Sequence, residues 1–179
     1  MTNSDRIQLA TREAVNADLE TMASAILERL PQPDDVILVG IHGKGGLIAT
    51  ALTPLLESRW GAKVTTGTLD VGMHRDDLDQ NPVPTLQPTN LPASITGKSI
   101  ILVEDVIQSG RTIRAALDAL HDFGRPDQVL LAVLIDRGGR RLPLTPAIVG
   151  RRVELEPDKR IRLSSLPDQF GLEVYVEPS

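Results

Sequence analysis

The sequence predicts an α/β protein built around a parallel sheet, because apolar runs and amphipathic stretches alternate four times along its 179 residues. The apolar runs are continuous, which is typical of strands buried on both faces of a sheet. Three of these runs end in the polar or glycine-rich segments HGKGG, EDVIQSGRT and DRGGR. Ligands bind beyond the carboxyl ends of parallel strands, so we expect these three segments to form one site.

The first half of the chain supplies two helices and two strands. Apolar residues at three- to five-residue steps predict the first helix, and Pro31 and Pro33 would end it. Gly61 is placed to end the second helix. The expected elements are a helix over residues 8–30, a strand over 36–41, a helix over 47–60 and a strand over 63–71.

The second half begins with a long polar segment, residues 72–97, which contains four prolines. A loop of this length in a compact domain is usually a lid or a binding loop, so we expect a flexible active-site loop here. The expected elements after it are a strand over residues 99–103, a helix over 112–123, a strand over 128–135 and short strands over 147–149 and 173–176. Without an internal repeat, residues 1–179 are predicted to form one domain.

Composition excludes several classes of protein. The 41% of hydrophobic residues indicate a globular chain, and the absence of cysteine excludes disulfides, zinc–thiolate sites and a cysteine nucleophile. No apolar run approaches the roughly 20 residues of a membrane span, and the start lacks the order of a signal peptide. The expectation is a cytoplasmic protein with no membrane partner. A net charge of -5 argues against a wholly basic nucleic-acid-binding surface.

The segment IILVEDVIQSGRT combines the features of a sugar-phosphate site. Two acids, Glu104 and Asp105, follow an apolar run, and a turn into the next helix comes shortly after them. Gly110 lets backbone approach a ligand closely, and amides at a helix start bind anions. Ser109 and Thr112 add hydroxyl donors, while carboxylates suit sugar hydroxyls or Mg²⁺. The alternative is a solvated strand end followed by an ordinary helix cap.

This segment resembles the motif with which type I phosphoribosyltransferases bind 5-phosphoribosyl 1-pyrophosphate (PRPP). The resemblance implies the fold of that family, a central parallel sheet flanked by helices with a small hood formed by the terminal segments. It implies that Glu104 and Asp105 face the ribose hydroxyls and organise Mg²⁺, directly or through water. The residues that would bind PRPP or the product nucleotide in this segment are Glu104, Asp105, Val106, Gln108, Ser109, Gly110, Arg111 and Thr112.

Further segments are similar to the PyrR branch of the family, pyrimidine operon attenuators with uracil phosphoribosyltransferase activity. These are Leu69-Asp70, HRDDL at residues 74–78 and LAVLIDRGGRRLP at residues 131–143. The resemblance extends from about residue 15 to residue 150. It implies the reaction of uracil and PRPP to UMP and pyrophosphate. Gln108 agrees with this branch, since hypoxanthine-guanine enzymes carry an aspartate there that serves the purine ring.

The remaining candidate site residues come from the other loops. HGKGG stands where PyrR proteins read K-T-R-G, so Gly43 and Lys44 are expected to face pyrophosphate, although lysine lacks the bidentate fork of arginine. The resemblance assigns Arg75 to pyrophosphate as well, and places Arg137 beside the base; Arg137 could instead form an ion pair with Asp136. The residues expected to act in catalysis are Lys44, Arg75 and Asp105.

The resemblance also implies messenger RNA as a partner. At the residues that would bind RNA, the sequence departs most from the PyrR branch. Glu20-Thr21 stands where a Thr-Arg pair would align in the first helix, and Glu20 would repel phosphate. Gly139 replaces a histidine in the D-R-G-H-R segment, although Arg140 remains. A homodimer or homotetramer is expected. Two alternative functions stay open: a UMP-sensing RNA-binding regulator with little catalysis, and a purine phosphoribosyltransferase.

Overall fold

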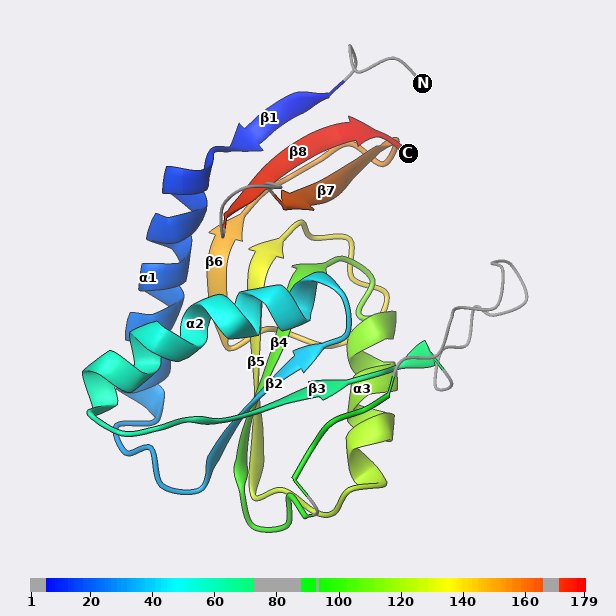
Figure 1. Ribbon diagram of the computed structural model, residues 1–179. Helices are drawn as coiled ribbons and strands as arrows, with labels where there is room; N and C mark the ends of the chain where they lie inside the picture. The colour runs from blue at the N-terminus through cyan, green and yellow to red at the C-terminus, as the bar shows by residue number, and fades with distance from the viewer. Residues whose placement is uncertain (1–5, 73–87, 93, 166–170) are drawn as a thin grey trace.

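The computed structural model describes residues 6–72, 88–92, 94–165 and 171–179. A five-stranded parallel sheet has the strand order β3-β2-β4-β5-β6, and a three-stranded antiparallel sheet has the order β1-β8-β7. The small sheet is the hood, and it lies beyond the carboxyl ends of the central strands (Figure 1). The elements are β1 (Ile7–Ala10), α1 (Arg12–Arg29), β2 (Val36–Ile41), α2 (Lys44–Trp60), β3 (Thr65–Leu69), β4 (Ser99–Ile107), α3 (Arg111–His121), β5 (Gln128–Asp136), β6 (Ile148–Arg152), β7 (Lys159–Ser165) and β8 (Leu172–Pro178).

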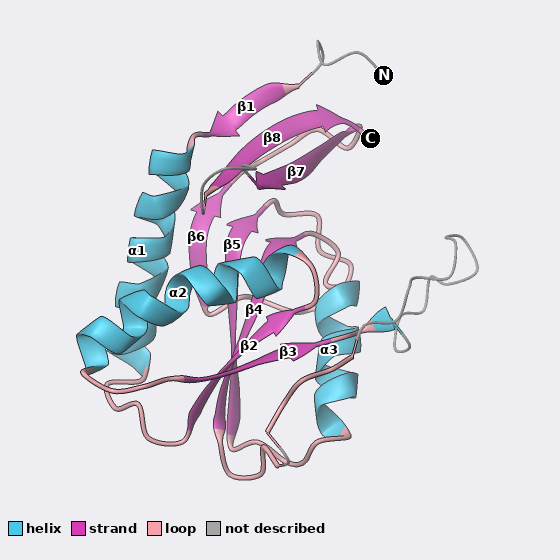
Figure 2. Ribbon diagram, in the orientation of Figure 1, coloured by secondary structure: helices cyan, strands magenta, loops and turns pink. Residues whose placement is uncertain are grey.

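Apolar side chains alternate between the two faces of the central sheet. On one face Leu38 and Ile101, neighbours on β2 and β4, pack against α1 and α2. On the other face Val39 and Leu102 pack with the buried residues of α3. The helices therefore cover both faces of the sheet (Figure 2). The predicted α/β architecture with a parallel sheet and a hood built from the terminal segments is confirmed.

The first helix begins later than predicted. Residues 7–10 form β1, which pairs with β8 near the other end of the chain, and α1 begins at Arg12. Thr11 is the N-cap, and its hydroxyl accepts a hydrogen bond from the amide of Ala14 at 3.3 Å. The predicted helix wrongly included β1, because this strand is defined by pairing with β8, more than 160 residues away. Local periodicity does not show such a distant partner.

The hood strand β7 was not predicted at all. Its sequence alternates Arg160 and Arg162, which are exposed, with Ile161 and Leu163, which face the interior. This two-residue period is typical of a strand with one solvated face. Among the described residues, no helix is long and apolar enough to cross a membrane.

The segment after β3 is described only in part. Asn90 pairs with Thr68 through two backbone hydrogen bonds of 2.8 and 2.9 Å, and Ile95 is fully buried. The Thr89 hydroxyl also accepts a hydrogen bond from the amide of Asp70 at 3.0 Å. The described end of the predicted 72–97 loop is therefore fixed against the edge of the central sheet.

Candidate functional site

The turn between β4 and α3 has the geometry of an anion cradle. Gly110 is the N-cap of α3 and adopts a left-handed conformation with φ 89° and ψ −2°, which favours glycine. No side chain caps this helix start, although the Ser109 hydroxyl accepts a hydrogen bond from the Arg111 amide at 3.3 Å. The positive end of the helix dipole and the amides of its first turn face the same space. This turn is able to bind a phosphate.

The sequence predicted that the two acids follow the strand, but in the structure they lie inside β4. Glu104 pairs with Val133 of β5, and the strand continues to Ile107. Glu104 is buried and its carboxylate accepts a hydrogen bond from the Asp105 amide at 2.9 Å. The Asp105 carboxylate accepts one from the Val106 amide at 2.8 Å. Because neighbouring strand residues point to opposite faces, only one of the two acids can face a given ligand directly.

The start of α2 packs directly on β4 beside these acids. A Cβ atom added at Gly45 would lie 2.7 Å from the Val103 carbonyl oxygen and 3.5 Å from a Glu104 carboxylate oxygen. Only glycine permits this approach of helix to strand. Gly43, the N-cap of α2, has φ 104°, so the turn that begins this helix also favours glycine. The HGKGG segment thus sets the distance between the first two loops of the site.

A cavity of about 310 Å³ opens beside the phosphate turn. It is bounded by the end of β4, the start of α3, the end of β5 and the hood strand β7. The lining residues are Asp105, Val106, Ile107, Gln108, Ser109, Gly110, Thr112, Ile113, Arg137, Arg160 and Ile161. Seven predicted site residues therefore meet in one cavity, namely Asp105, Val106, Gln108, Ser109, Gly110, Thr112 and Arg137.

Other predicted residues lie beside this cavity without lining it. Arg111 is exposed on the first turn of α3, and Glu104 is buried in β4. The Lys44 ammonium donates a hydrogen bond to the Ser165 hydroxyl of β7 at 3.4 Å, so its side chain reaches toward the hood. Arg75 lies outside the described residues, as does the HRDDL segment at residues 74–78. Its role remains a prediction.

Arg137 is the most unusual side chain at the cavity. It is only 9% exposed, and its Nε atom has no hydrogen-bond partner among the described residues. The expected alternative, an ion pair with Asp136, is not formed: Asp136 pairs with Arg140, with 2.6 Å between Nη2 and Oδ1. A buried donor without a partner is costly, so it indicates an acceptor that a ligand would bring.

The Asp136 carboxylate is held ionised at the base of this loop. Burial by itself would raise its pKa, but hydrogen bonds from Arg140 and the Gly138 amide, with the nearby charge of Arg152, outweigh burial and lower it. The Gly138 amide donates to Asp136 at 3.0 Å. The loop after β5 is therefore organised around a charged carboxylate.

Two hood residues, Arg160 and Ile161, line the cavity and were not among the predicted site residues. Arg160 is held by Glu177 of β8, with 3.0 Å between Nε and Oε1. Glu177 also binds Arg6 at 2.8 Å and Arg162 at 3.5 Å. Burial would raise the pKa of Glu177, but Arg6 and Arg160 lower it further than burial raises it. The alternation of β7 was the signal in the sequence that places Arg160 on a strand.

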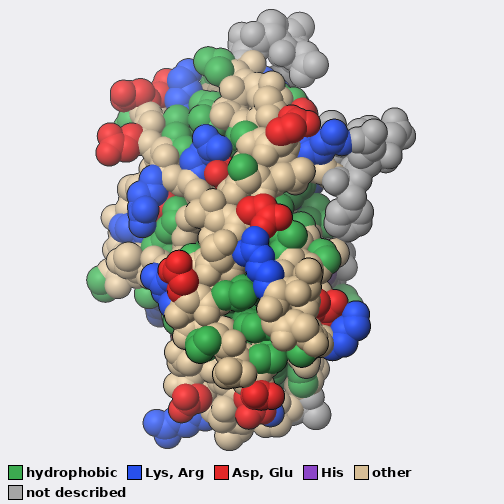
Figure 3. All heavy atoms as spheres, turned by 90° about the vertical axis from the view of Figure 1, so that its left-hand side faces the viewer, with side chains coloured by type: hydrophobic (Ala, Val, Ile, Leu, Met, Phe, Trp, Pro, Cys, Tyr) green, Lys and Arg blue, Asp and Glu red, His purple; other side chains and the backbone are tan. Residues whose placement is uncertain are grey.

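Many basic side chains of the 137–162 stretch are bound within the chain. Arg140 pairs with Asp136, and Arg151 makes two hydrogen bonds with Asp18 of α1, at 2.9 and 3.2 Å. On the described part of the face turned to the viewer in Figure 3, basic and acidic groups are interspersed instead of forming one basic field. These arginines mainly join elements of the fold.

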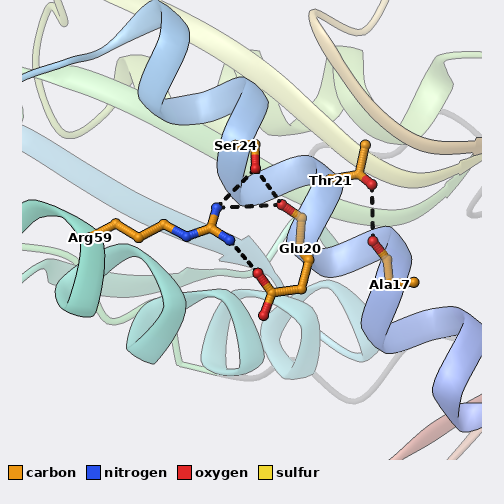
Figure 4. Close-up of polar contacts among 5 residues, drawn as sticks. All are labelled: Ala17, Glu20, Thr21, Ser24 and Arg59. Atoms are coloured by element: carbon orange, nitrogen blue, oxygen red, sulfur yellow. Dashed lines mark hydrogen bonds and ion pairs between the residues drawn. The ribbon is translucent and has the colours of Figure 1, made fainter.

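Glu20 is likewise engaged on α1. Its carboxylate pairs with Arg59 of α2, which also donates a hydrogen bond to the Ser24 hydroxyl at 3.0 Å (Figure 4). The Thr21 hydroxyl donates to the Ala17 carbonyl of its own helix at 3.0 Å. The surface that the resemblance assigned to RNA thus carries an acid fixed between two helices.

These features define a class of protein, the phosphoribosyltransferases. They are a parallel sheet, a turn able to bind phosphate, an adjacent acid and a hood. The sequence profile of the phosphoribosyl transferase domain matches residues 7–160, and the chain belongs to this family. Within it, the chain is 46% identical over 156 residues to the bifunctional protein PyrR of Corynebacterium diphtheriae, covering 84% of this chain and 82% of that protein. It is 41% identical over 169 residues to the bifunctional protein PyrR of Halalkalibacterium halodurans, covering 92% and 93%. The predicted resemblance to PyrR proteins is confirmed.

Solved structures share the fold at low sequence identity. The hypoxanthine phosphoribosyltransferase of Trypanosoma cruzi in complex with the product IMP has a TM-score of 0.71 and 17% identity, with 97% of this chain and 96% of that chain covered. A hypoxanthine-guanine phosphoribosyltransferase of Bacillus anthracis has a TM-score of 0.67 and 20% identity, with 88% of each chain covered. At this identity the likeness bears on the fold and not on the choice of base.

Proposed function

We propose that the protein transfers the phosphoribosyl group of PRPP to uracil, giving UMP and pyrophosphate. The observation that carries this proposal is that one cavity is lined by Asp105, by residues of the turn at 109–112 and by the buried Arg137, whose Nε has no hydrogen-bond partner among the described residues. A phosphate, a sugar diol and an oxo-base each have a suitable neighbour there. The PyrR relatives support uracil as the base.

In this mechanism the turn at the start of α3 holds the 5-phosphate, and Asp105 accepts hydrogen bonds from the ribose hydroxyls. The glycosidic C–O bond to pyrophosphate breaks, the N1 atom of uracil bonds to C1 of the ribose, and the N1 proton passes to the departing pyrophosphate or to solvent. The transition state resembles an oxocarbenium ion, so positioning and charge dominate over proton transfer. Gln108, a neutral amide, is a poor general base, which agrees with such a reaction.

Mg²⁺ fits this site as a companion of PRPP. The described residues contain no cluster of three or more acidic or histidine side chains that could hold a metal by themselves. Mg²⁺ usually keeps waters and binds through one or two carboxylates together with substrate phosphates. Asp105 would supply the carboxylate, since Glu104 is buried in β4 and does not line the cavity. The ion would neutralise charge on the departing pyrophosphate.

We assign the base and the pyrophosphate to opposite sides of the ribose. Arg137 would donate its free Nε–H to a carbonyl oxygen of uracil, which ends its lack of a partner. The Gln108 side chain lies against the same loop, with its Cγ 3.4 Å from the position of a Cβ on Gly139. Gly43 and Lys44 would meet pyrophosphate at the start of α2, and Arg75 would join them.

A base panel tests this function. The protein is incubated with PRPP, Mg²⁺ and uracil, cytosine, hypoxanthine or guanine in turn, and nucleotide formation is measured. We expect product with uracil alone. Product only with hypoxanthine or guanine would overturn the uracil assignment and favour a purine enzyme. Asp105→Asn should abolish most product, while Asp118→Asn, an exposed acid on α3, should leave the rate unchanged.

A second function is supported by the name of the relatives, which are bifunctional proteins. We propose UMP-dependent regulation through pyrimidine-leader RNA as this candidate. Arg59 is paired with Glu20 and Arg151 with Asp18, so neither arginine offers an unpaired charge to RNA. Filter binding of leader RNA with and without UMP tests it, and RNA retention that does not respond to UMP would remove it. Sedimentation of the free protein would test the expected homo-oligomer.

A further inference from the structure

Arg140 lies behind the cavity and is bound from several sides within its own loop. Its Nε donates a hydrogen bond to the Leu144 carbonyl at 3.0 Å, and its Nη2 pairs with Asp136 at 2.6 Å. Its Nη1 lies 3.4 Å from the Gly138 carbonyl. The guanidinium therefore joins the beginning and the end of the loop that follows β5.

The same guanidinium crosses to the phosphate turn. Nη1 donates to the Gln108 carbonyl at 3.0 Å and lies 3.4 Å from the Ile107 carbonyl. These carbonyls are the last backbone acceptors before the turn that would bind the 5-phosphate. One planar side chain thus connects the end of β4 with the loop that carries Arg137.

Backbone contacts run parallel to this side chain. The amides of Arg141 and Leu142 both donate to the Ser109 carbonyl, at 3.0 and 3.1 Å. A Cβ on Gly110 would lie 3.4 Å from a Leu144 methyl and 3.5 Å from the Leu142 Cβ. The loop after β5 therefore packs against the phosphate turn. Arg140 is the side chain that forms hydrogen bonds with both segments.

We propose that Arg140 is a positioning residue that sets the phosphate turn at a fixed distance from the base-facing loop. It does not line the cavity, so it acts through the groups that do. The planar fork of arginine can serve acceptors on both loops at once, whereas lysine presents one compact charge and can reach only one of them. We call the contacts of Arg140 with Gln108, Asp136 and Leu144 the brace. The brace exists without ligand, whereas its expected effect on kinetics rests on the proposed function.

The brace is tested first in the free protein, by amide hydrogen exchange of Arg140→Gln against the wild type. The matched control is Arg141→Gln, the neighbouring exposed arginine. We expect exchange in residues 108–113 to accelerate about tenfold in Arg140→Gln, with exchange in β2 unchanged, and no change in the control. Equal protection of residues 108–113 in Arg140→Gln and wild type would overturn the proposal.

Kinetics separate positioning from plain stabilisation. Arg140→Lys keeps a cation next to Asp136, so its melting temperature should stay close to that of the wild type. Its KM for PRPP should still rise about tenfold and its kcat should fall, since a small misplacement of reacting groups is costly. Unchanged KM and kcat in Arg140→Lys would contradict the positioning role. A wild type without uracil transfer would instead overturn the proposed function, and the exchange comparison would still decide the brace.

Discussion

The two walls of the cavity are stabilised in different ways. The phosphate wall, β4 and α3, is supported by buried apolar residues such as Ile100, Leu102 and Ile113. The groups that we propose to bind the phosphate there are largely backbone amides. The hood wall, β7, is held by Glu177, which binds Arg160 and Arg162 of β7 and Arg6, just before β1. The phosphate wall should therefore be rigid and insensitive to pH, whereas the hood wall depends on the charge of one carboxylate.

The largest expected effect comes from Gly45→Ala, which breaks the phosphate wall. The added methyl would lie 2.7 Å from the Val103 carbonyl, so α2 or β4 must move. We expect a loss of about 1–3 kcal/mol in unfolding free energy and loss of most PRPP binding, measured by denaturant unfolding and titration. Gly46→Ala is the control, since its methyl meets nothing closer than 3.9 Å and should stabilise the helix. Equal behaviour of the two variants would contradict the close packing.

Arg137→Met should raise stability and lower activity, because the side chain is proposed to serve the ligand and not the fold. Removal of a buried Nε–H that has no hydrogen-bond partner among the described residues should raise the unfolding free energy by about 1 kcal/mol. At the same time the KM for uracil should rise, while PRPP binding stays near the wild-type value. Thermal denaturation and steady-state kinetics measure the two effects. A destabilised variant would show that Arg137 has a structural partner in the free protein.

Glu177→Gln should weaken the hood wall and leave the phosphate wall intact. Without the carboxylate, Arg6, Arg160 and Arg162 repel one another across the hood. We expect a lower melting temperature at neutral pH, with faster hydrogen exchange in β1, β7 and β8. Exchange in β4 should remain as in the wild type. A uniform loss of protection across both sheets would mean that the two walls are not independent.

The difference in stability between the wild type and Glu177→Gln should depend on pH. The pKa of Glu177 is lower in the folded chain than its ordinary value, so its contribution to stability is complete above the ordinary glutamate range. The contribution is lost as the pH falls through the lowered folded value. The difference in melting temperature between wild type and Glu177→Gln should therefore shrink under acidic conditions. A difference that stays constant or grows on acidification would contradict the charge-based account of the hood.

The smallest effect is expected at the junction of hood and central domain. Thr11 caps α1 immediately after β1, with the Ala14 amide as donor. Thr11→Ala should reduce the unfolding free energy by about 1 kcal/mol without a change in uracil transfer. Denaturant unfolding measures this loss. A change in KM for PRPP would show that the start of α1 is coupled to the site.

The comparison also explains what the sequence could predict. Continuous apolar runs such as 36–41 and 99–103 identify strands buried on both faces, because their burial is encoded locally. The motif around Gly110 likewise predicted a turn, since φ > 0 and an adjacent acid are local features. The hood depends on pairing between the two ends of the chain, which local periodicity does not show. Arg160 was missed as a site residue for this reason.

The role of Arg140 also lay beyond the sequence. Its five donors reach acceptors on segments more than 30 residues apart, at Gln108 and at Leu144. Backbone carbonyls carry no sequence signature, so a motif can show that an arginine is present without showing what it binds. Arg137 and Arg140 are close in sequence. Yet within the described part of the chain the Arg137 Nε has no hydrogen-bond partner, whereas the Arg140 guanidinium binds Asp136 and several carbonyls.

A crystal structure with bound UMP tests the central claim most directly. The account predicts the nucleotide phosphate within hydrogen-bond distance of the amides of residues 110–112, the ribose hydroxyls next to Asp105 and a uracil oxygen on the Arg137 Nε. UMP seated elsewhere, with no anion at the start of α3, would contradict it.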